Sequence, residues 1–149
     1  MTMDADAARV WFRLLRLQTR INLAITERVR ALGLSVPQCD VLTTLTEREG
    51  ISQQELAERL YVTKGNISGL IDRLEAAQLV ERRSLETDKR SHAIYLTAQG
   101  RDLAEQGIAV QRRFVLDTLG RMAPDDLAKF ESLLVNVRDL VRETESKAD

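Results

Sequence analysis

The feature that most constrains the fold is a change in the spacing of apolar residues halfway along this 149-residue chain. Up to that point, four apolar residues recur three or four positions apart, which is the repeat of one helix face: Ile67, Leu70, Ile71 and Leu74. Directly afterwards, the segments 79–83 and 92–96 alternate apolar and polar residues, as half-buried strands do. We therefore predict a short helix followed by a β-hairpin, with the polar stretch 84–91 at the hairpin tip.

Three further helices are predicted before this hairpin, each with its own start or stop signal. The first covers residues 10–32 and ends at Gly33, and its apolar stripe is broad enough to contact two surfaces. The second begins at Ser35, which is followed by a proline and by a glutamine that completes a capping box. Another capping box starts at Ser52 and opens a third helix of barely two turns. Thr63 can cap the fourth helix, which carries the stripe named above.

Two longer helices are predicted after the hairpin. Thr97 can cap the first of them, and Pro124, followed by two aspartates, begins the second. The second carries an apolar stripe with alternating spacings of three and four: Leu127, Phe130, Leu134, Val137 and Val141. A stripe of this kind requires a helical partner, which predicts a homodimer. The polar ends of the chain, 1–6 and 143–149, are expected to fray.

The composition excludes several classes of protein. One cysteine excludes an intrachain disulfide, and one cysteine with one histidine cannot supply the ligands of a zinc site. The N-terminus carries aspartates where a signal peptide would be basic, and no apolar stretch is long enough for a transmembrane helix. Neither a glycine-rich phosphate loop nor an arranged nucleophile and base is visible. We therefore expect a cytoplasmic protein that is not an enzyme, needs no cofactor or metal and does not bind membranes.

Two short helices joined by a tight turn and followed by a hairpin make a winged helix-turn-helix, here in a mainly α fold with a small β-hairpin wing. In that motif the second helix enters the major groove of DNA, and the hairpin reaches the flanking backbone. The helix face opposite the apolar stripe is unusually small, and its first turn offers Lys64, Asn66 and Ser68 as hydrogen-bonding groups for base edges. The alternative is that these polar residues are merely solvated, but the wing favours DNA binding.

The hairpin also contains a spaced motif in the sequence ETDKRSHAIYLT. Asp88 and Arg90 form an Asp-x-Arg pair, and Leu96 and Thr97 follow after five residues. With the surrounding segment 52–97, this motif resembles the multiple antibiotic resistance regulator (MarR) family. The resemblance covers nearly the whole chain, because the family also has a long first helix and two C-terminal helices that interleave with those of a second subunit. It implies a dimeric transcription regulator of bacteria or archaea whose DNA affinity usually falls when a small ligand or an oxidant acts.

The resemblance assigns roles to individual residues. Arg90 matches the wing-tip arginine that lies in or near the minor groove, and Asp88 matches the acid that holds the wing in shape. The start of the recognition helix, which contacts bases and phosphates, matches five residues: Thr63, Lys64, Gly65, Asn66 and Ser68. Arg73 matches a phosphate contact further along that helix. One position departs from the family, because Gln78 stands where a glycine is usual. A left-handed residue other than glycine costs about 1 kcal/mol, so this turn is either strained or capped in another way.

The predicted organisation is one compact domain with three parts. Residues 1–34 and 97–149 are expected to form the dimerisation helices, and residues 35–96 the winged helix-turn-helix. A dimer would place its two recognition helices about one DNA turn, roughly 34 Å, apart on a pseudopalindromic double-stranded operator. The function predicted from these features is sequence-specific transcription regulation, most simply repression.

Charge is not concentrated on the predicted DNA-facing part. The net charge of the chain is -1, and residues 63–96 carry six basic and five acidic residues. This balance predicts modest nonspecific DNA affinity, because that affinity comes from neutralising phosphates with Lys and Arg. Arg83 and Lys89 lie on the predicted wing with Arg90, and we expect all three to contact DNA. The alternative is that Arg82 and Arg83 pair with nearby carboxylates: Glu81, Glu86 or Asp88.

An effector site is expected between the dimerisation helices and the DNA-binding part. Five residues are predicted to line it with apolar walls and one cation for an acidic aromatic ligand or an acyl thioester: Trp11, Phe12, Arg16, Cys39 and Phe114. The alternative is that they belong only to the core. Cys39 is expected to be structural, because the neighbouring Asp40 opposes a thiolate. Two rival functions stay open: an oxidant-sensing regulator that uses Cys39, and a winged-helix interaction module that does not bind DNA.

Overall fold

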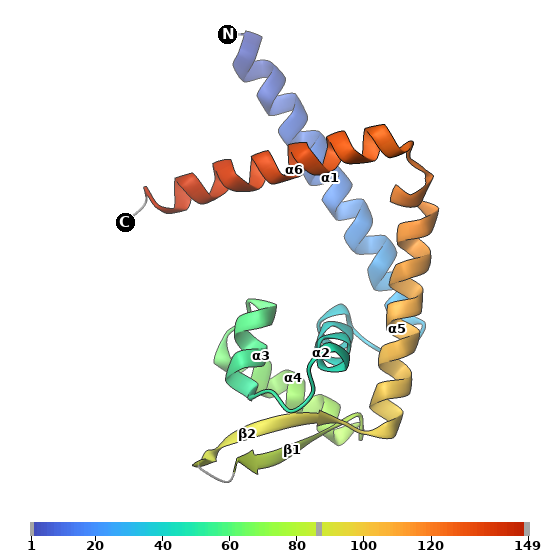
Figure 1. Cartoon of the computed structure of the whole chain (residues 1–149), viewed down its shortest axis with the longest axis vertical. Helices are drawn as coiled ribbons and strands as arrows, with labels where there is room; N and C mark the ends of the chain where they lie inside the picture. The colour runs from blue at the N-terminus through green and yellow to red at the C-terminus, as the bar shows by residue number, and fades with distance from the viewer. Residues whose placement is uncertain (1, 86–87, 148–149) are drawn as a thin grey trace. The chain divides into compact units, whose positions relative to one another are not determined.

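The computed structural model describes residues 2–85 and 88–147, with the side chains of 4–85 and 91–147. Within these residues the elements are α1 (Thr2–Arg30), α2 (Val36–Glu47), α3 (Gln53–Leu60), α4 (Lys64–Ala76), β1 (Val80–Leu85), β2 (Asp88–Leu96), α5 (Ala98–Asp117), the short 3₁₀ helix η1 (Leu119–Arg121) and α6 (Pro124–Glu145) (Figure 1). The predicted mainly helical fold with a two-stranded hairpin is confirmed. No helix within the described ranges is both long enough and apolar enough to span a membrane.

Helix α1 begins at Thr2 instead of Val10, so the expected fraying of the N-terminus is wrong. Three alanines in its first turns favour a helix. Asp4 lies in the first turn, where a negative charge interacts favourably with the helix dipole, and Asp6 forms an ion pair with Arg9 at 2.7 Å. Apolar periodicity does not detect such a segment, because it contributes nothing to the core. The first half of α1 extends away from α2, α3 and α4 (Figure 1).

The capping signals in the sequence are used as predicted. The N–H of Gln38 donates to Ser35 Oγ at 3.3 Å, and the N–H of Ser35 donates to Gln38 Oε1 at 3.0 Å, which completes the capping box of α2. At the start of α3, Ser52 Oγ accepts the N–H of Glu55 at 3.0 Å. Each bond satisfies a backbone N–H that has no partner within the helix. Local signals therefore set where these helices begin.

The hairpin is longer than predicted. Strands β1 and β2 pair antiparallel, with Val80 opposite Leu96 and Ser84 opposite His92, and the register shifts between Ser84 and Leu85. Pairing continues into the charged stretch because backbone hydrogen bonds do not require apolar side chains. Alternation of apolar residues detects only the part of each strand that contacts the core.

A segment before α3 also pairs with β2, which the sequence did not predict. The N–H of Gly50 donates to the carbonyl of Ile94, and the N–H of Ile94 donates to the carbonyl of Ile51, both at 2.9 Å. Ser52 and Ala93 form an isolated antiparallel bridge. These bonds attach the connection between α2 and α3 directly to the hairpin.

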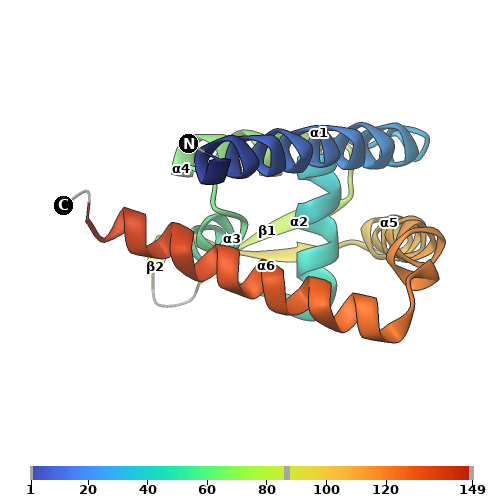
Figure 2. The same ribbon diagram turned by 90° about the horizontal axis from the view of Figure 1, so that it is seen from above.

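The core lies where α2, α3 and α4 pack against the hairpin (Figures 1 and 2). Its largest fully buried side chains come from each of these elements and from the end of α1: Val29, Leu42, Leu45, Leu56, Ile67, Ile71, Leu74 and Ile94. All four residues of the stripe predicted for α4 are buried. Since a fully buried aliphatic side chain stabilises a fold by about 1.5–3 kcal/mol, this core fixes the inward face of α4.

Helix α5 approaches the core through two glycines. A Cβ at Gly100 would lie 1.8 Å from the carbonyl oxygen of Leu79, and a Cβ at Gly107 would lie 2.7 Å from Cys39 Sγ. Any larger residue would force these elements apart, so the two glycines permit close packing.

The chain divides into two compact units, residues 1–111 and 112–149. The second unit contains the end of α5, η1 and α6, and none of its residues within 112–147 is buried. The stripe predicted for α6 is present on the helix, and its side chains are largely exposed: Leu127 (37%), Leu134 (48%), Val137 (46%) and Val141 (49%).

Candidate nucleic-acid interface

The start of α4 presents polar groups to solvent on a capped helix end. Thr63 is the N-cap residue, and its Oγ1 accepts the N–H of Asn66 at 3.2 Å. Thr63, Lys64, Gly65 and Asn66 are all exposed, whereas Ser68 is half-buried. The sequence thus predicted correctly where this helix begins and that the side chains of Lys64 and Asn66 reach solvent.

The outward face of α4 leaves the helix backbone accessible, because two of its residues are glycines that packing does not require. A Cβ at Gly65 would meet nothing within 4 Å, and one at Gly69 would meet only Arg73 Nη2 at 3.9 Å. Arg73 itself is exposed on the same face. Here the fold has room for side chains that the sequence omits, so a partner that approaches the backbone closely is the better explanation of the glycines.

Arg82 connects the hairpin to α4 and α3. Its guanidinium lies 2.7 Å from Asp72 Oδ1 and 3.2 Å from Glu75 Oε1, and it donates to Gln53 Oε1 and to the carbonyl of Ser68, each at 3.2 Å. The backbone N–H of Arg82 also donates to Glu75 Oε2 at 3.0 Å. Its side chain is only 17% exposed. Arg82 therefore pairs with carboxylates of α4, which the sequence did not offer as partners, and it fixes the hairpin against α4.

Arg83 has a different environment on the outer side of the hairpin. Its guanidinium pairs with Glu81 and lies 3.9 Å from the ring centroid of Tyr95. The hydrogen bond to Glu81 raises the pKa of Arg83 above its ordinary value, so the side chain stays charged. Glu81 is one of the carboxylates proposed as alternative partners; the other two, Glu86 and Asp88, have side chains outside the described residues. The Arg83 side chain is 58% exposed.

The wing tip carries three residues predicted to be functional: Asp88, Lys89 and Arg90. Their backbone forms the first part of β2, and their side chains lie outside the described residues. Their expected roles, wing stabilisation for Asp88 and DNA contact for Lys89 and Arg90, stay predictions.

The junction between α4 and the hairpin uses a non-glycine residue in a left-handed conformation, which is the first of the two possibilities that the sequence left open. Gln78 has φ 61°. The turn is closed by a hydrogen bond from the N–H of Leu79 to the carbonyl of Leu74 at 2.9 Å, and Thr97 Oγ1 donates to the carbonyl of Gln78 at 2.7 Å. These bonds hold a conformation that is unfavourable for Gln78 by itself.

Tyr61, which lies at the turn between α3 and α4, was not predicted from the sequence. It also has a left-handed backbone, with φ 54°, and its side chain is 96% exposed. The partners of Arg82 were not predicted either, because Asp72, Glu75 and Gln53 read individually as polar surface residues. A signal for Tyr61 was present, because a tight turn between two helices commonly requires a left-handed residue.

The five residues predicted to line an effector site are not gathered around the hollow at the junction of α1 and α2. Trp11 and Phe12 are 54% and 58% exposed, Arg16 is exposed, and Cys39 is fully buried in the core. Phe114 lies in the second unit and is half-buried. None of the five lines that hollow.

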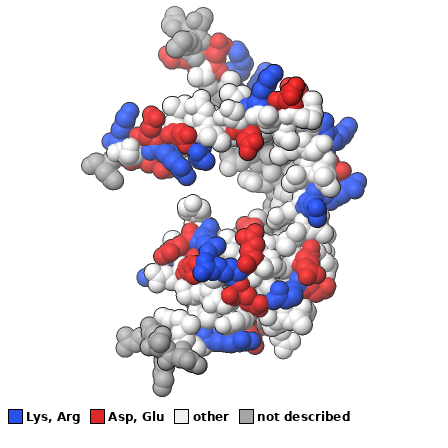
Figure 3. Space-filling model, viewed as in Figure 1, with Lys and Arg blue, Asp and Glu red and all other residues white. Residues whose placement is uncertain are grey.

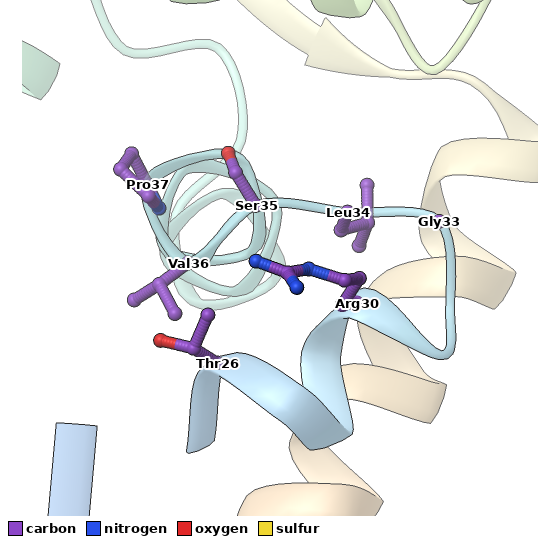
Figure 4. A pocket seen from close by; sticks show the side chains of 7 residues that line it. All are labelled: Thr26, Arg30, Gly33, Leu34, Ser35, Val36 and Pro37. Atoms are coloured by element: carbon purple, nitrogen blue, oxygen red, sulfur yellow. The ribbon is translucent and has the colours of Figure 1, made fainter. Parts of the chain in front are cut away.

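This hollow, here called the Arg30 hollow, has a volume of about 470 Å³. It is lined by the end of α1, the start of α2 and the turn between them: Thr26, Arg30, Gly33, Leu34, Ser35, Val36 and Pro37 (Figure 4). Its lining is mostly apolar, and Arg30 is its one ionisable residue. The volume falls within the range of roughly 300–1,000 Å³ found for small-molecule sites.

Cys39 has the environment of a structural cysteine. Burial, followed by the charge of Asp40, raises the pKa of its thiol above the ordinary value. A neutral, buried thiol reacts slowly with oxidants, because the thiolate is the nucleophile. Cys39 lies opposite Gly107, where α5 packs closely, and this explains why a small apolar residue occupies the position.

Charges of both signs are interspersed over the surface in Figure 3. Lys and Arg therefore do not form a continuous positive field on the face shown, in agreement with the balanced charge of segment 63–96. On this face, the placement of single groups matters more than overall charge.

Comparison with known proteins identifies this architecture. The model of the MarR family matches residues 34–92, from the turn before α2 into β2. A helix-turn-helix transcriptional repressor of Mycobacterium bovis is 30% identical over 130 residues, which are 87% of this chain and 94% of the repressor. The chain belongs to the MarR family.

Solved structures agree with this membership in the MarR family. The crystal structure of a MarR family transcription regulator, SP03579, matches 98% of this chain and 99% of its own, with a TM-score of 0.87 and 18% identity. The regulator PcaV of Streptomyces coelicolor, crystallised with its natural ligand, matches 85% of this chain and 89% of its own, with a TM-score of 0.72 and 25% identity. The winged helix-turn-helix fold predicted from the order of helices and hairpin is thus confirmed.

Proposed function

We propose that this chain is a homodimeric, sequence-specific DNA-binding repressor that is released from its operator by a small acidic ligand. In this proposal α4 enters the major groove, and the wing, β1 with β2, reaches the adjacent minor groove. The observation that carries it is the outward face of α4, where exposed Lys64 and Asn66 stand beside Gly65, which the packing does not need. The M. bovis relative, a transcriptional repressor, supports the same function.

In this proposal Asn66 is the main residue that recognises a base, and the basic residues around it bind the sugar–phosphate backbone of the DNA. Lys64, Arg73, Lys89 and Arg90 are the proposed phosphate or groove contacts, and Arg83 joins them when it leaves Glu81. Thr63 holds the helix end that presents these groups. Asn66 is suited to its role because a side-chain amide pairs with the edge of adenine through two hydrogen bonds.

Selection from random DNA duplexes with the purified chain tests this function. We expect one pseudopalindromic operator to be enriched, and its affinity to fall steeply with salt. Asn66→Ala should weaken operator binding by about 1–3 kcal/mol and leave binding to random DNA unchanged, whereas Arg90→Ala should weaken both. An interaction module that does not bind DNA would enrich no sequence and show no shift at low salt.

Homodimer formation is proposed from two exposed apolar surfaces. One lies on α1, where Trp11, Leu17 and Leu23 are 54%, 46% and 66% exposed, and the other is the stripe on α6. Monomeric soluble proteins rarely expose large contiguous apolar patches, so a second copy of the chain is expected to cover these residues. Sedimentation should give a dimer at micromolar concentration, and a folded monomer would contradict the proposal.

The Arg30 hollow is the proposed effector site. It combines apolar walls with one cation, which suits a carboxylate on an aromatic or acyl group. The ligand-bound structure of PcaV, at 25% identity, supports control by a small molecule. A ligand between α1 and α2 would contact both the dimerisation helix and the DNA-binding part. If it binds one arrangement of these two parts more tightly than the arrangement that fits DNA, it would lower operator affinity by about 5–150-fold.

Two charge-removing variants distinguish this site from the one that the sequence predicted. Operator release is titrated with a panel of aromatic acids and acyl thioesters for the parent, Arg30→Gln and Arg16→Gln. We expect Arg30→Gln to require more ligand for release and Arg16→Gln to behave like the parent. The reverse result would assign the ligand to the exposed site near Trp11 and Phe12. Release by peroxide that is abolished in Cys39→Ser would instead favour an oxidant sensor.

A further inference from the structure

A second, polar hollow lies between the start of α3, the start of α4 and β2, and is called here the α3–α4–β2 hollow. Its volume is about 250 Å³, and besides Ile67 it is lined by six polar residues: Ser52, Gln53, Gln54, Lys64, Ser91 and His92. This volume is below the usual range of small-molecule sites, so the hollow fits a smaller group. His92 is the only histidine of the chain, and neither the core nor the wing network described above uses it.

The position of the hollow follows from how a winged helix-turn-helix meets DNA, and this step rests on the proposed function. Helix α4 is proposed to enter the major groove, and the wing the neighbouring minor groove. The two grooves are separated by one sugar–phosphate strand, so that strand must cross the gap between α4 and the wing. The α3–α4–β2 hollow lies in this gap, because Lys64 belongs to α4 and His92 to β2.

The groups around the hollow are hydrogen-bond donors and one cation. Gln53 accepts a bond from Arg82 Nε with its Oε1 at 3.2 Å, which leaves its amide nitrogen as a donor. Among the described residues, the amide nitrogen of Gln54 has one long contact, 3.5 Å, to Glu58 Oε1. The first turn of α3 adds backbone N–H groups, and Ser52 Oγ accepts the one that belongs to Glu55.

Negative charge is absent from the lining that the structure describes. Of the two acids on α3, Glu55 pairs with Arg59 at 3.2 Å and with Arg48 at 3.5 Å, and Glu58 has only the long contact with Gln54 named above and does not line the hollow. Donors from three elements, with Lys64 and without a lining carboxylate, match the two non-bridging oxygens and the single negative charge of a phosphodiester better than a neutral or cationic ligand.

We propose that the α3–α4–β2 hollow binds one phosphate of the DNA backbone in each half-site. A ring N–H of His92 and the amide of Gln54 donate to the phosphate oxygens, and Lys64 supplies the positive charge. The contact fixes the register of α4 in the groove, because the wing and the helix then hold the same strand from both sides.

Neutralising single phosphates tests the site in the intact dimer. Operator duplexes with one methylphosphonate at each position in turn are titrated with the parent, His92→Ala, His92→Gln and Gln54→Ala. For the parent we expect a loss at each contacted phosphate, and at the one phosphate per half-site that occupies the hollow a loss of about tenfold in affinity, the scale of a hydrogen bond to a charged group. His92→Ala and Gln54→Ala should bind the unmodified operator more weakly and lose much less at that position, whereas His92→Gln, which keeps a donor, should resemble the parent.

A control and two contrary outcomes complete the test. Gln106→Ala removes an amide on α5 that donates to Asp102 at 3.0 Å, and it should keep the full loss at the identified phosphate. Thermal melting establishes whether each variant is folded. If His92→Ala is not folded, the loss of affinity measured for Gln54→Ala at the same phosphate tests the site. Normal operator binding with no phosphate coupled to His92 or Gln54 would overturn the site alone. No operator binding by the parent would overturn the proposed function, and the site with it.

Discussion

Replacing Gly69 with alanine separates what α4 contributes to stability from what its outward face contacts. Gly69 is the sixth of the 13 residues of α4, well inside the helix, where alanine is more favourable than glycine by about 0.8–1.0 kcal/mol. The new Cβ would meet only Arg73 Nη2, at 3.9 Å, which is an ordinary contact. We therefore expect Gly69→Ala to raise the free energy of unfolding by about 0.5–1 kcal/mol.

The same methyl group should weaken operator binding. If DNA approaches the backbone of α4 at Gly69, the methyl holds the helix away from the base edges. The loss should be of the order of one base-edge contact, about 1–3 kcal/mol in each half-site. Stability is measured by denaturant unfolding at one fixed protomer concentration, because a dimer gains stability with concentration. Operator affinity is measured at one salt concentration, because salt changes it independently.

Gly100→Ala is the matched control for the packing argument. Its Cβ would lie 1.8 Å from the carbonyl oxygen of Leu79, so the same substitution should destabilise the protein there. Two results would refute the reasoning about Gly69→Ala. A loss of stability would show that the outward face of α4 is packed at Gly69. A gain of stability with unchanged operator affinity would show that DNA does not approach this face closely.

Four further predictions use other features of the structure. Gln78→Gly should raise the thermal midpoint by relieving a left-handed backbone, a gain of about 1 kcal/mol. Burial raises the pKa of Asp40, so the folded state binds the Asp40 proton more tightly than the unfolded state does. The protein therefore loses stability as pH rises from the ordinary pKa of Asp to the raised pKa of the folded state. Asp40→Asn should be more stable than the parent at neutral pH, and this difference should vanish below the ordinary pKa of Asp. Leu134→Asp should convert the proposed dimer to monomer or unfold it, as sedimentation and circular dichroism would report. Iodoacetamide should modify Cys39 only when the protein unfolds, which mass spectrometry can follow.

Helix starts and the inward faces could be predicted because their signals are local. Ser35, Ser52 and Thr63 bond to backbone N–H groups three residues ahead, so a few letters of sequence contain the whole interaction. The buried stripe of α4 has the same property, because one helix face is fixed by spacing. At Gln78 the local signal was incomplete: the sequence allowed either a strained left-handed residue or another cap, and the structure has the left-handed residue.

Contacts between distant segments could not be predicted in the same way. Arg82 binds Gln53, 29 residues away, and Leu96 donates its N–H to Glu49, 47 residues away. No spacing rule links such pairs, and several carboxylates near Arg82 in the sequence were equally plausible partners. The effector residues show the same limit, because Cys39 was grouped with Trp11 by chemistry alone, whereas in the structure Cys39 is buried and Trp11 is exposed.

The two faces of α4 have separate tasks, and this decides what its variants report. Ile67 and Leu74 hold the helix to the core, whereas Asn66 is exposed and its side chain supports no packing in the structure. A variant at Asn66 therefore changes binding with little effect on folding. Arg82 differs, because it joins α4 to the hairpin with a largely buried side chain, so its loss changes both stability and the angle between helix and wing. Sequence preference can thus be altered through the outward face of α4 alone, provided that the Arg82 network stays intact.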